Sequence, residues 1–246
     1  MIKEFTCDLH IHTCLSPCGD LDMYPRAIIK KCLKERLNVV GICDHNASEN
    51  VEYVMEAARG TPIVVLPGME ITTKEEVHII ALFDNVDDLL FIQEFVYKSL
   101  HGMNREEIFG CQPIVNEKNE IEGFNEHLLI GATGHSLNET VEEIHRCHGL
   151  AIAAHIDRES FGIIGQLGFI PGDIHFDALE VSFRTGTKKI REQHPELTRY
   201  AVIESSDAHF INDIGKGKTR FHMECPTIFE LKLALEGREG RFFVTP

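Results

Sequence analysis

Basic residues are scarce in this chain. It has 24 lysines and arginines against 39 aspartates and glutamates, which gives a net charge of -15 at neutral pH. Proteins that bind long nucleic acids need many cationic contacts to phosphates, so this composition argues against that class of partner. It does not exclude a small anionic substrate, because bound metal ions would reverse the local field.

Paired cysteine motifs and long apolar segments are also missing. None of the eight cysteines forms a Cys-x-x-Cys pair, and no apolar run is long enough to cross a membrane. The first residues contain no apolar signal segment, so we expect a cytoplasmic protein rather than one from an oxidising compartment. Cys7 and Cys43 lie in apolar runs and are predicted to be buried thiols.

Short apolar runs alternate with amphipathic segments along the chain. The runs have the uninterrupted apolar character of strands that are buried on both faces of a parallel sheet. This alternation predicts an α/β fold, either a β/α barrel or an open sheet. The predicted strands are 5–9, 39–43, 63–66, 77–83, 150–154, 178–182 and 201–205. The predicted helices are 27–36, 49–59 and 86–99, with two more that follow capping boxes at 136–139 and 227–230.

Residues 101–135 interrupt this alternation of predicted strands and helices. The segment contains several glycines, one proline and a polar run at 116–120. We interpret it as an insertion within a single domain of residues 1–246. A hairpin with strands near 112–115 and 122–124 is expected inside it, in a position to cover the mouth of a barrel.

Polar side chains of one kind collect where the predicted strands end. In barrels and open α/β sheets the active site lies at the carboxyl ends of the strands. Histidine, aspartate and glutamate without cysteine form a ligand set that suits Zn, Mn or Fe. Five strand ends carry such residues, in the motifs Asp8-Leu9-His10-Ile11-His12, Asp44-His45, Glu70 with His78, His155-Ile156-Asp157 and Asp207-Ala208-His209.

The spacing of the first motif shows why such residues form a metal site. Residues two apart in extended backbone point to the same side, so His10 and His12 can both face the barrel mouth. Two imidazoles there can form a two-ligand binding site for a divalent metal. Asp44 is a candidate for orienting a neighbouring ligand by a hydrogen bond. His78 taken alone would be a core histidine, and each motif alone is weak, but the five together indicate a metal cluster.

In their order, these motifs resemble those of the PHP family, named for the polymerase and histidinol phosphatase proteins. The matching segments are DLHIHT, CDHN, PGMEITT with EVHII, AAHID and SSDAH, and they span residues 7–210. The resemblance implies a distorted β/α barrel, usually of seven strands. It also implies a metal-dependent phosphoesterase with two or three divalent ions of Zn, Mn or Fe.

The resemblance also assigns the metal ligands by matching positions. His10, His12 and Asp207 would hold the first ion, and Glu70 would bridge the first and second. His78 and His155 would complete the second site, while His45 and His209 would hold the third. The family often has an aspartate where this chain has Pro17, so we expect Asp20 to replace it, with Cys18 as the softer alternative.

The implied reaction is hydrolysis of a phosphate ester by a metal-activated hydroxide. His209 is a candidate proton donor to the leaving group, beside Asp207, and Arg158 and Arg184 are candidates for a phosphate clamp. The expected substrate is a nucleoside mono- or bisphosphate or a short oligonucleotide. A histidinol phosphate-type phosphatase is a less favoured reading, as are a metal-dependent C–N hydrolase and a non-catalytic metal-binding module. No lysine stands at a predicted strand end to bridge metals as in many C–N hydrolases.

Overall fold

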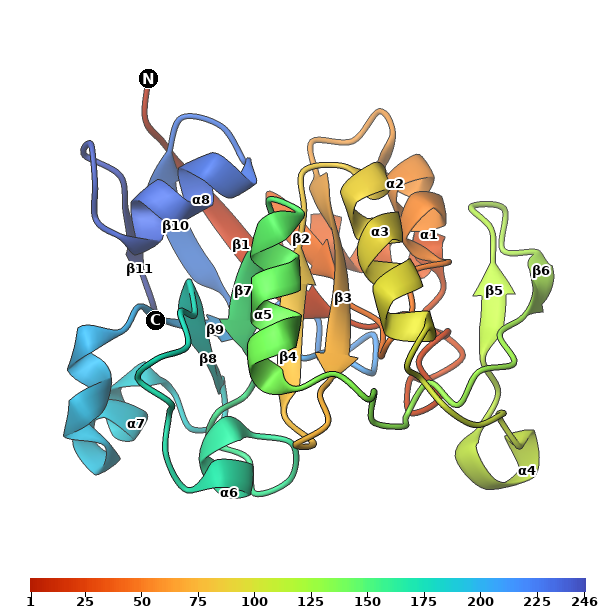
Figure 1. Ribbon diagram of the computed structural model, residues 1–246. Coiled ribbons are helices and arrows are strands. Elements are labelled where there is room, and N and C mark those ends of the chain that lie inside the picture. The colour runs from red at the N-terminus through yellow and green to blue at the C-terminus, as the bar shows by residue number, and fades with distance from the viewer.

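Nine strands form one curled sheet in the computed structural model, which describes residues 1–246 (Figure 1). The strand order is β11-β10-β1-β2-β3-β4-β7-β8-β9. The strands are β1 (Lys3–Ile11), β2 (Val39–Ile42), β3 (Val64–Thr72), β4 (His78–Leu82), β7 (Leu150–Ala153), β8 (Ala178–Ser182), β9 (Val202–Ser205), β10 (Thr219–Met223) and β11 (Phe242–Val244). A separate two-stranded sheet pairs β5 (Pro113–Val115) with β6 (Ile121–Phe124).

The helices fall mostly between consecutive strands, as the alternating pattern predicted. They are α1 (Pro25–Lys34), α2 (Val51–Ala58), α3 (Val86–Tyr97), α4 (Glu106–Phe109), α5 (Leu137–Arg146), α6 (Ile163–Leu167), α7 (Thr187–Gln193) and α8 (Ile228–Leu235), with a 3-10 helix at Pro195–Arg199. Ser136 and Glu139 form the predicted capping box, and the Thr227 side chain accepts a hydrogen bond from the Glu230 amide. None of these helices combines the length and apolar character needed to cross a membrane.

The sheet curls far enough for the end of β1 to meet the segment that follows β9. A parallel bridge joins Ile11 at the end of β1 to Ala208 just after β9, and the His12 amide donates to the Ala208 carbonyl at 3.0 Å. Seven strands, from β1 through β9 in sheet order, therefore enclose a distorted β/α barrel. This confirms the predicted fold class. β10 and β11, which the sequence pattern did not reveal, extend the sheet outward from β1 as antiparallel strands.

One expectation about the sheet was wrong. The apolar runs were read as strands of a parallel sheet, but β4 pairs antiparallel with both β3 and β7. Only residues 73–77 separate β3 from β4. A parallel pair needs a crossover of a dozen or more residues, so this short connection permits only a hairpin. The reversal brings the first residue of β4, His78, to the edge where the neighbouring strands end.

Two apolar layers hold the barrel together. The interior packs side chains from the sheet, among them Leu9, Leu66, Ile80 and Ile203, together with Phe221 from β10. A larger layer fills the space between the sheet and the surrounding helices. Cys7 and Cys43 belong to the interior layer and are fully buried free thiols, as predicted.

The expected hairpin is present within residues 101–135. β5 and β6 pair antiparallel close to the predicted positions. The hairpin is anchored to the start of α2, because the Asn50 side chain bonds Pro113 and Val115. Figure 1 shows it standing to one side of the sheet, beside α1 and α2. The description of the chain as a single domain with this insertion stays a prediction.

A bulge in β1 positions the first metal-site motif. Asp8 pairs with Val40 and Ile11 pairs with Ile42, so Leu9 and His10 together face the single residue Gly41. A Cβ atom at Gly41 would lie 2.4 Å from the Leu9 carbonyl oxygen, which is too close for any side chain. The bulge therefore depends on a glycine at this position.

Gly41→Ala is expected to lower the free energy of unfolding by about 1–3 kcal/mol, because the new methyl group must push β1 away. The same shift should weaken metal binding through His10. Chemical denaturation of the metal-free protein measures the first effect and chelator competition the second. Gly123→Ala is the matched control, since nothing lies within 4 Å of a Cβ there. Equal stability of both variants would contradict this account of the bulge.

Candidate metal centre

The residues of the five motifs meet at one edge of the barrel. His10 lies in β1 and His12 directly follows it, Glu70 lies in β3, and His78 is the first residue of the reversed β4. His45, His155, Asp207 and His209 lie in the loops that directly follow β2, β7 and β9. Motifs that are far apart in the sequence are thus brought together by the closure of the sheet.

Glu70 is the centre of the cluster. Its carboxylate is fully buried, and five histidine rings surround it. The nitrogens of His45, His78 and His155 lie 2.9, 2.9 and 3.0 Å from its two oxygens. The Nε2 atoms of His10 and His12 are each 3.4 Å from it. One carboxylate therefore lies within reach of every cation that these histidines could hold.

His10 and His12 face each other as the strand geometry predicted. Their Nε2 atoms are 3.0 Å apart, and Asp207 Oδ1 lies 3.1 Å from His12 Nε2 and 3.5 Å from His10 Nε2. Lone pairs from two imidazoles and a carboxylate converge on one small volume. Such convergence is unfavourable without a cation, and it is the geometry of a divalent metal seat.

A third group of donors lies nearer the solvent. His209 stacks on His12 with ring centres 4.0 Å apart, and its side chain is 18% exposed. Nitrogen atoms of His12, His45 and His209 all lie within 4.8 Å of one another. Two further groups of the same compactness are His10, His12 and Glu70, and His45, Glu70 and His78.

The protonation of the cluster follows from its charges. Burial opposes ionisation of Glu70, but the neighbouring histidines, His78 and His10 first, outweigh it and hold the pKa of the carboxyl well below its usual range. Burial likewise disfavours a charge on His10, yet Glu180 and Glu70 raise the pKa of that imidazole well above normal. Burial together with His209 and His45 lowers the pKa of His12.

The donor set fits divalent metal ions. Imidazole nitrogens and carboxylate oxygens are common ligands of Zn, Mn and Fe. Buried polar atoms here lack hydrogen-bond partners, including His155 Nδ1 and Glu70 Oε2. His45 Nδ1 lies 2.9 Å from that Glu70 oxygen without the geometry of a hydrogen bond. Orphaned buried donors and acceptors are costly, and cations placed among them would satisfy the acceptors.

Backbone strain accompanies the site. Asn46, His155 and Asp207 have positive φ values of 51°, 27° and 48°, a region that residues other than glycine seldom adopt. Each stands in a loop directly after a strand. Positive φ turns the chain sharply there. The His155 and Asp207 side chains reach the cluster, whereas the Asn46 amide group donates to the Leu129 and Gly131 carbonyls. Such strain is concentrated at functional sites.

Glu180 is a member of the site that the sequence motifs did not reveal. It lies buried in the middle of β8, and its carboxylate is 3.1 and 3.3 Å from His10 Nδ1. The His155 amide also donates to Glu180 Oε1 at 3.2 Å. The contact fixes the ring of His10 and leaves its Nε2 directed toward the cluster. In the sequence, the only indication of this role was a charged residue within an otherwise apolar predicted strand.

Two other buried carboxylates support the loops. Asp44 accepts hydrogen bonds from the Thr13 amide and from both the Thr13 and Ser16 hydroxyls, and Ser16 Oγ lies 2.9 Å from His12 Nδ1. Asp8 accepts from the amides of Ser206 and Gly215, which brackets the loop that carries Asp207 and His209. Burial raises the pKa of Asp8 to about 6.

The remaining predicted residues are placed differently. The guanidinium of Arg158 pairs with Asp207 and is 45% exposed, so it lies at the mouth of the site. Arg184 lies on the exposed turn after β8 against Phe183. The carboxylate of Asp20 accepts from the Asp22 amide at 2.8 Å and belongs to none of the compact donor groups. Cys18 instead contacts His45 and His209. Burial opposes its ionisation, but these two contacts lower the pKa of the Cys18 thiol to about 6.

The PHP domain model matches residues 8–168 of this sequence, which is more than half of the chain. The protein belongs to the PHP family. Its compact groups of histidine and glutamate side chains are groups that could hold a metal ion. No match was found among curated protein sequences.

Solved structures share the fold at low sequence identity. Endonuclease Q from Pyrococcus furiosus, a lesion-specific endonuclease, is 17% identical with a TM-score of 0.72, and the alignment covers 98% of this chain and 58% of that one. An endonuclease Q complex with a 27-mer duplex containing an abasic lesion gives 18% and 0.71 with the same coverage. A protein from Bifidobacterium adolescentis described as a metal-dependent phosphoesterase gives 18% and 0.52, covering 83% and 87%. The chain thus spans less than two thirds of endonuclease Q.

Glu180→Gln is expected to weaken metal binding by about 10–100-fold, because the neutral amide no longer fixes and polarises His10. Chelator competition with Zn²⁺ or Mn²⁺ measures the affinity. Glu204→Gln is the matched control, since Glu204 is a buried glutamate on the neighbouring strand that bonds the Thr187 amide outside the cluster. Unchanged affinity in the Glu180 variant would show that His10 needs no such support.

Proposed function

We propose that this protein hydrolyses a phosphate ester of a nucleotide or a short oligonucleotide with the help of two or three divalent ions. The observation that carries the proposal is the buried Glu70 carboxylate within reach of five histidines. The proposed metal ligands are His10, His12, His45, Glu70, His78, His155, Asp207 and His209. Membership of the PHP family supports the phosphoester chemistry.

Divalent ions held there would supply Lewis acidity and a water of lowered pKa. The protein groups contribute by their placement. Glu70 and Asp207 remain ionised, since histidines hold the pKa of both carboxyls well below normal against the opposing effect of burial. They offset the positive charge of several cations packed close together. The buried walls keep bulk water away from the ligands and so strengthen every electrostatic contact with the phosphoryl group.

Two side chains at the mouth are placed to act on the substrate. His209 is the most exposed histidine of the cluster, and Cys18 and Asp207 raise its pKa against the effect of burial. When no third ion is bound to it, it can carry a proton toward a leaving oxygen. Arg158 is half exposed and pairs with Asp207, so its guanidinium can turn to a phosphate oxygen. Arg184 is assigned a weaker, outer contact with a phosphate, since it lies on the exposed turn after β8.

The substrate class rests on the size and openness of the cluster. The donors lie at the end of the barrel, and His209 and Arg158 border solvent, so a terminal or flanking phosphate can enter while the rest of the molecule stays outside. A mononucleotide or the end of a short strand meets this requirement. Duplex DNA is the substrate in one structural relative, and the fold similarity by itself does not extend that activity to this chain.

Phosphate release from metal-reconstituted protein tests the proposal. The panel holds nucleoside 5′-monophosphates, 3′,5′-bisphosphates, short oligonucleotides, histidinol phosphate and an aryl phosphate. We expect metal-dependent turnover that falls by at least about a hundredfold in His10→Ala, because an incomplete ligand set loses the ion that polarises the phosphate. His101→Ala, at an exposed histidine outside the cluster, is the control and should retain the rate. No turnover of any phosphate by the metal-loaded protein would refute the proposal.

A further inference from the structure

The loop between β1 and α1 is tied to the metal centre at two points. Ser16 Oγ lies 2.9 Å from His12 Nδ1 and accepts from the His45 amide at 3.2 Å. The Asp20 amide donates to the His209 carbonyl at 2.9 Å. Between these points the Gly19 amide closes a tight turn onto the Ser16 carbonyl at 2.8 Å. The segment between Ser16 and Asp20 is therefore held against the outer part of the cluster.

Cys18 lies in the middle of this anchored segment. Its thiol adjoins the side chains of His45 and His209, the two residues expected to hold the third ion. The residue is exposed on its outer side, so this corner of the cluster faces solvent. Two imidazoles and one sulfur with an open side form the three-ligand arrangement of a catalytic metal site.

Neither nearby alternative occupies this corner. The Asp20 carboxylate turns back to accept the Asp22 amide. Cys14 is buried and its sulfur lies 3.8 Å from the Asn50 amide nitrogen, away from the histidines. The aspartate common in the family at this place is replaced by Pro17, which offers no ligand atom.

We propose that Cys18 is a thiolate ligand of the third metal ion, together with His45 and His209. This inference rests on the proposed metal centre. A soft sulfur ligand favours Zn²⁺, Fe²⁺ or Co²⁺ over Mn²⁺ and Mg²⁺, so the third site differs in metal preference from the nitrogen and oxygen sites deeper in the barrel. The exposed side of the site would be left open to substrate.

Cobalt substitution provides a test that does not depend on turnover. The metal-free protein is titrated with Co²⁺, and the near-ultraviolet spectrum is recorded for a sulfur-to-cobalt charge-transfer band. We expect the band in the wild type and its loss in Cys18→Ser and Cys18→Asp. Cys111→Ser and Cys225→Ser are the controls, because these two are the other cysteines not fully enclosed by the protein.

The spectra separate the possible failures. Cobalt d–d bands without a charge-transfer band in the wild type would overturn the role of Cys18 and leave the metal centre standing. A charge-transfer band that persists in Cys18→Ser would do the same. Absence of any cobalt spectrum would overturn the proposed metal centre itself. In Cys18→Asp we expect the number of bound ions to be retained, since a carboxylate oxygen replaces the sulfur.

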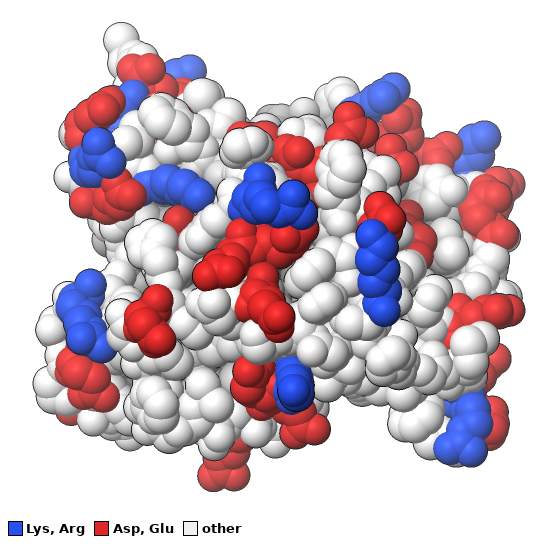
Figure 2. Space-filling view, viewed as in Figure 1, with Lys and Arg blue, Asp and Glu red and all other residues white.

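A different observation concerns the surface beside the site. On the face of the molecule shown in Figure 2, lysines and arginines are scattered singly among acidic residues. Helix α1, in contrast, carries Arg26, Lys30 and Lys34 at intervals of four residues, so they form one stripe about 12 Å long. All three are exposed, while the adjacent Lys31 is paired with Glu35. A protein of net charge -15 thus keeps a local row of cations.

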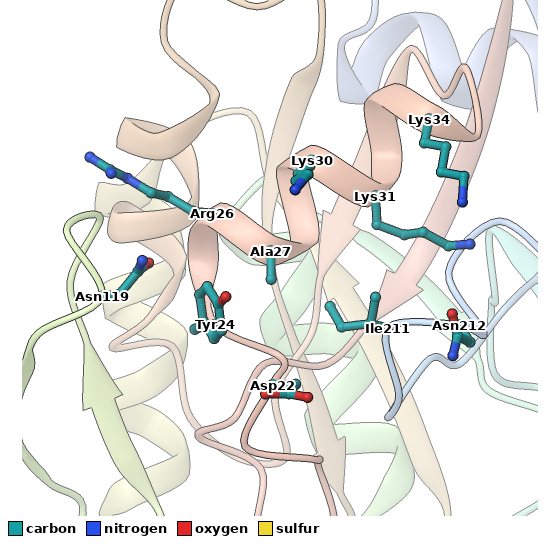
Figure 3. Close-up of a pocket in the computed structure, with 10 residues that line it drawn as sticks. All are labelled: Asp22, Tyr24, Arg26, Ala27, Lys30, Lys31, Lys34, Asn119, Ile211 and Asn212. Atoms are coloured by element: carbon teal, nitrogen blue, oxygen red, sulfur yellow. The ribbon is translucent and has the colours of Figure 1, made fainter.

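This stripe lines a hollow of about 500 Å³, and two segments of its wall lead directly to the metal centre along the chain (Figure 3). Asp22 closes one end, two residues after Asp20, and Ile211 and Asn212 follow His209 closely in the chain. Figure 3 shows Lys31 and Lys34 reaching toward the segment that carries Ile211 and Asn212, with Tyr24 between the helix and Asp22. The hollow therefore lies along α1, with the segment that follows His209 as its opposite wall.

We infer that this hollow binds the flanking phosphates of a single-stranded oligonucleotide whose end lies at the metal centre. Cations in a row along a groove and a half-buried tyrosine able to stack on a base are the elements of single-strand binding. Asn119, at the tip of the β5–β6 hairpin, also lines the hollow, which assigns the insertion a part in holding the strand. The single negative residue, Asp22, lies at the end nearest the cluster.

Binding is measured on metal-free protein, so that no turnover is needed and failure of the proposed hydrolysis would not affect the result. The probe is a fluorescent oligothymidylate of about eight nucleotides, followed by anisotropy at several salt concentrations. The combined variant Arg26→Glu, Lys30→Glu and Lys34→Glu should bind at least about tenfold more weakly. Its plot of log affinity against log salt should be shallower by about 2, because three phosphate contacts are lost.

The control reverses three equally exposed cations elsewhere, at Arg59, Lys98 and Arg146, and should bind like the wild type. Circular dichroism confirms that both variants are folded. Equal weakening in the two variants would show a general effect of net charge and overturn the inference. Wild-type protein that does not bind the probe at low salt would overturn it as well.

Discussion

The ionised carboxylate of Glu70, buried with five histidines around it, is the interaction on which the rest of the site depends. An isolated carboxylate without access to water would be very costly to bury. Here it is compensated by imidazoles that reach it from β1, from the loops after β2 and β7, and from the start of β4. The cluster therefore links the strands of the barrel as well as preparing a place for cations.

Neighbouring side chains and loops hold the residues of this cluster in place. Glu180 and Asp44 direct the rings of His10 and His12, the latter through Ser16, and Asp8 holds the loop that carries Asp207. Strained backbone at His155 and Asp207 turns those side chains inward. Such strain persists only where the surrounding packing enforces it, and both apolar layers of the barrel do so here.

The outer part of the centre differs in character from the inner part. The inner donors are buried nitrogens and oxygens, whereas the outer corner combines the more exposed His209 with the Cys18 thiol and borders solvent. Basic residues on α1 begin close to this corner, although the protein as a whole is acidic. The distribution of charge is thus local: carboxylates and imidazoles gather in the buried cluster, and basic side chains line the hollow along α1.

Much of this protein was determined by local sequence. Uninterrupted apolar runs indicated all seven barrel strands, capping residues marked the starts of α5 and α8, and the motifs around His10, His45, Glu70, His155 and Asp207 indicated a metal cluster and the PHP family. These features are readable because they depend on residues that are neighbours in the chain. The reversal of β4 follows from its short connection to β3, which the structure revealed by extending β3 to Thr72. The outer strands β10 and β11 and the support of His10 by Glu180 were decided only in the tertiary structure. The same is true of the choice between Cys18 and Asp20 as the neighbour of His209, because a turn of a few residues sets which side chain faces inward. Contacts between residues far apart in sequence depend on how the sheet closes, and no local pattern records that closure.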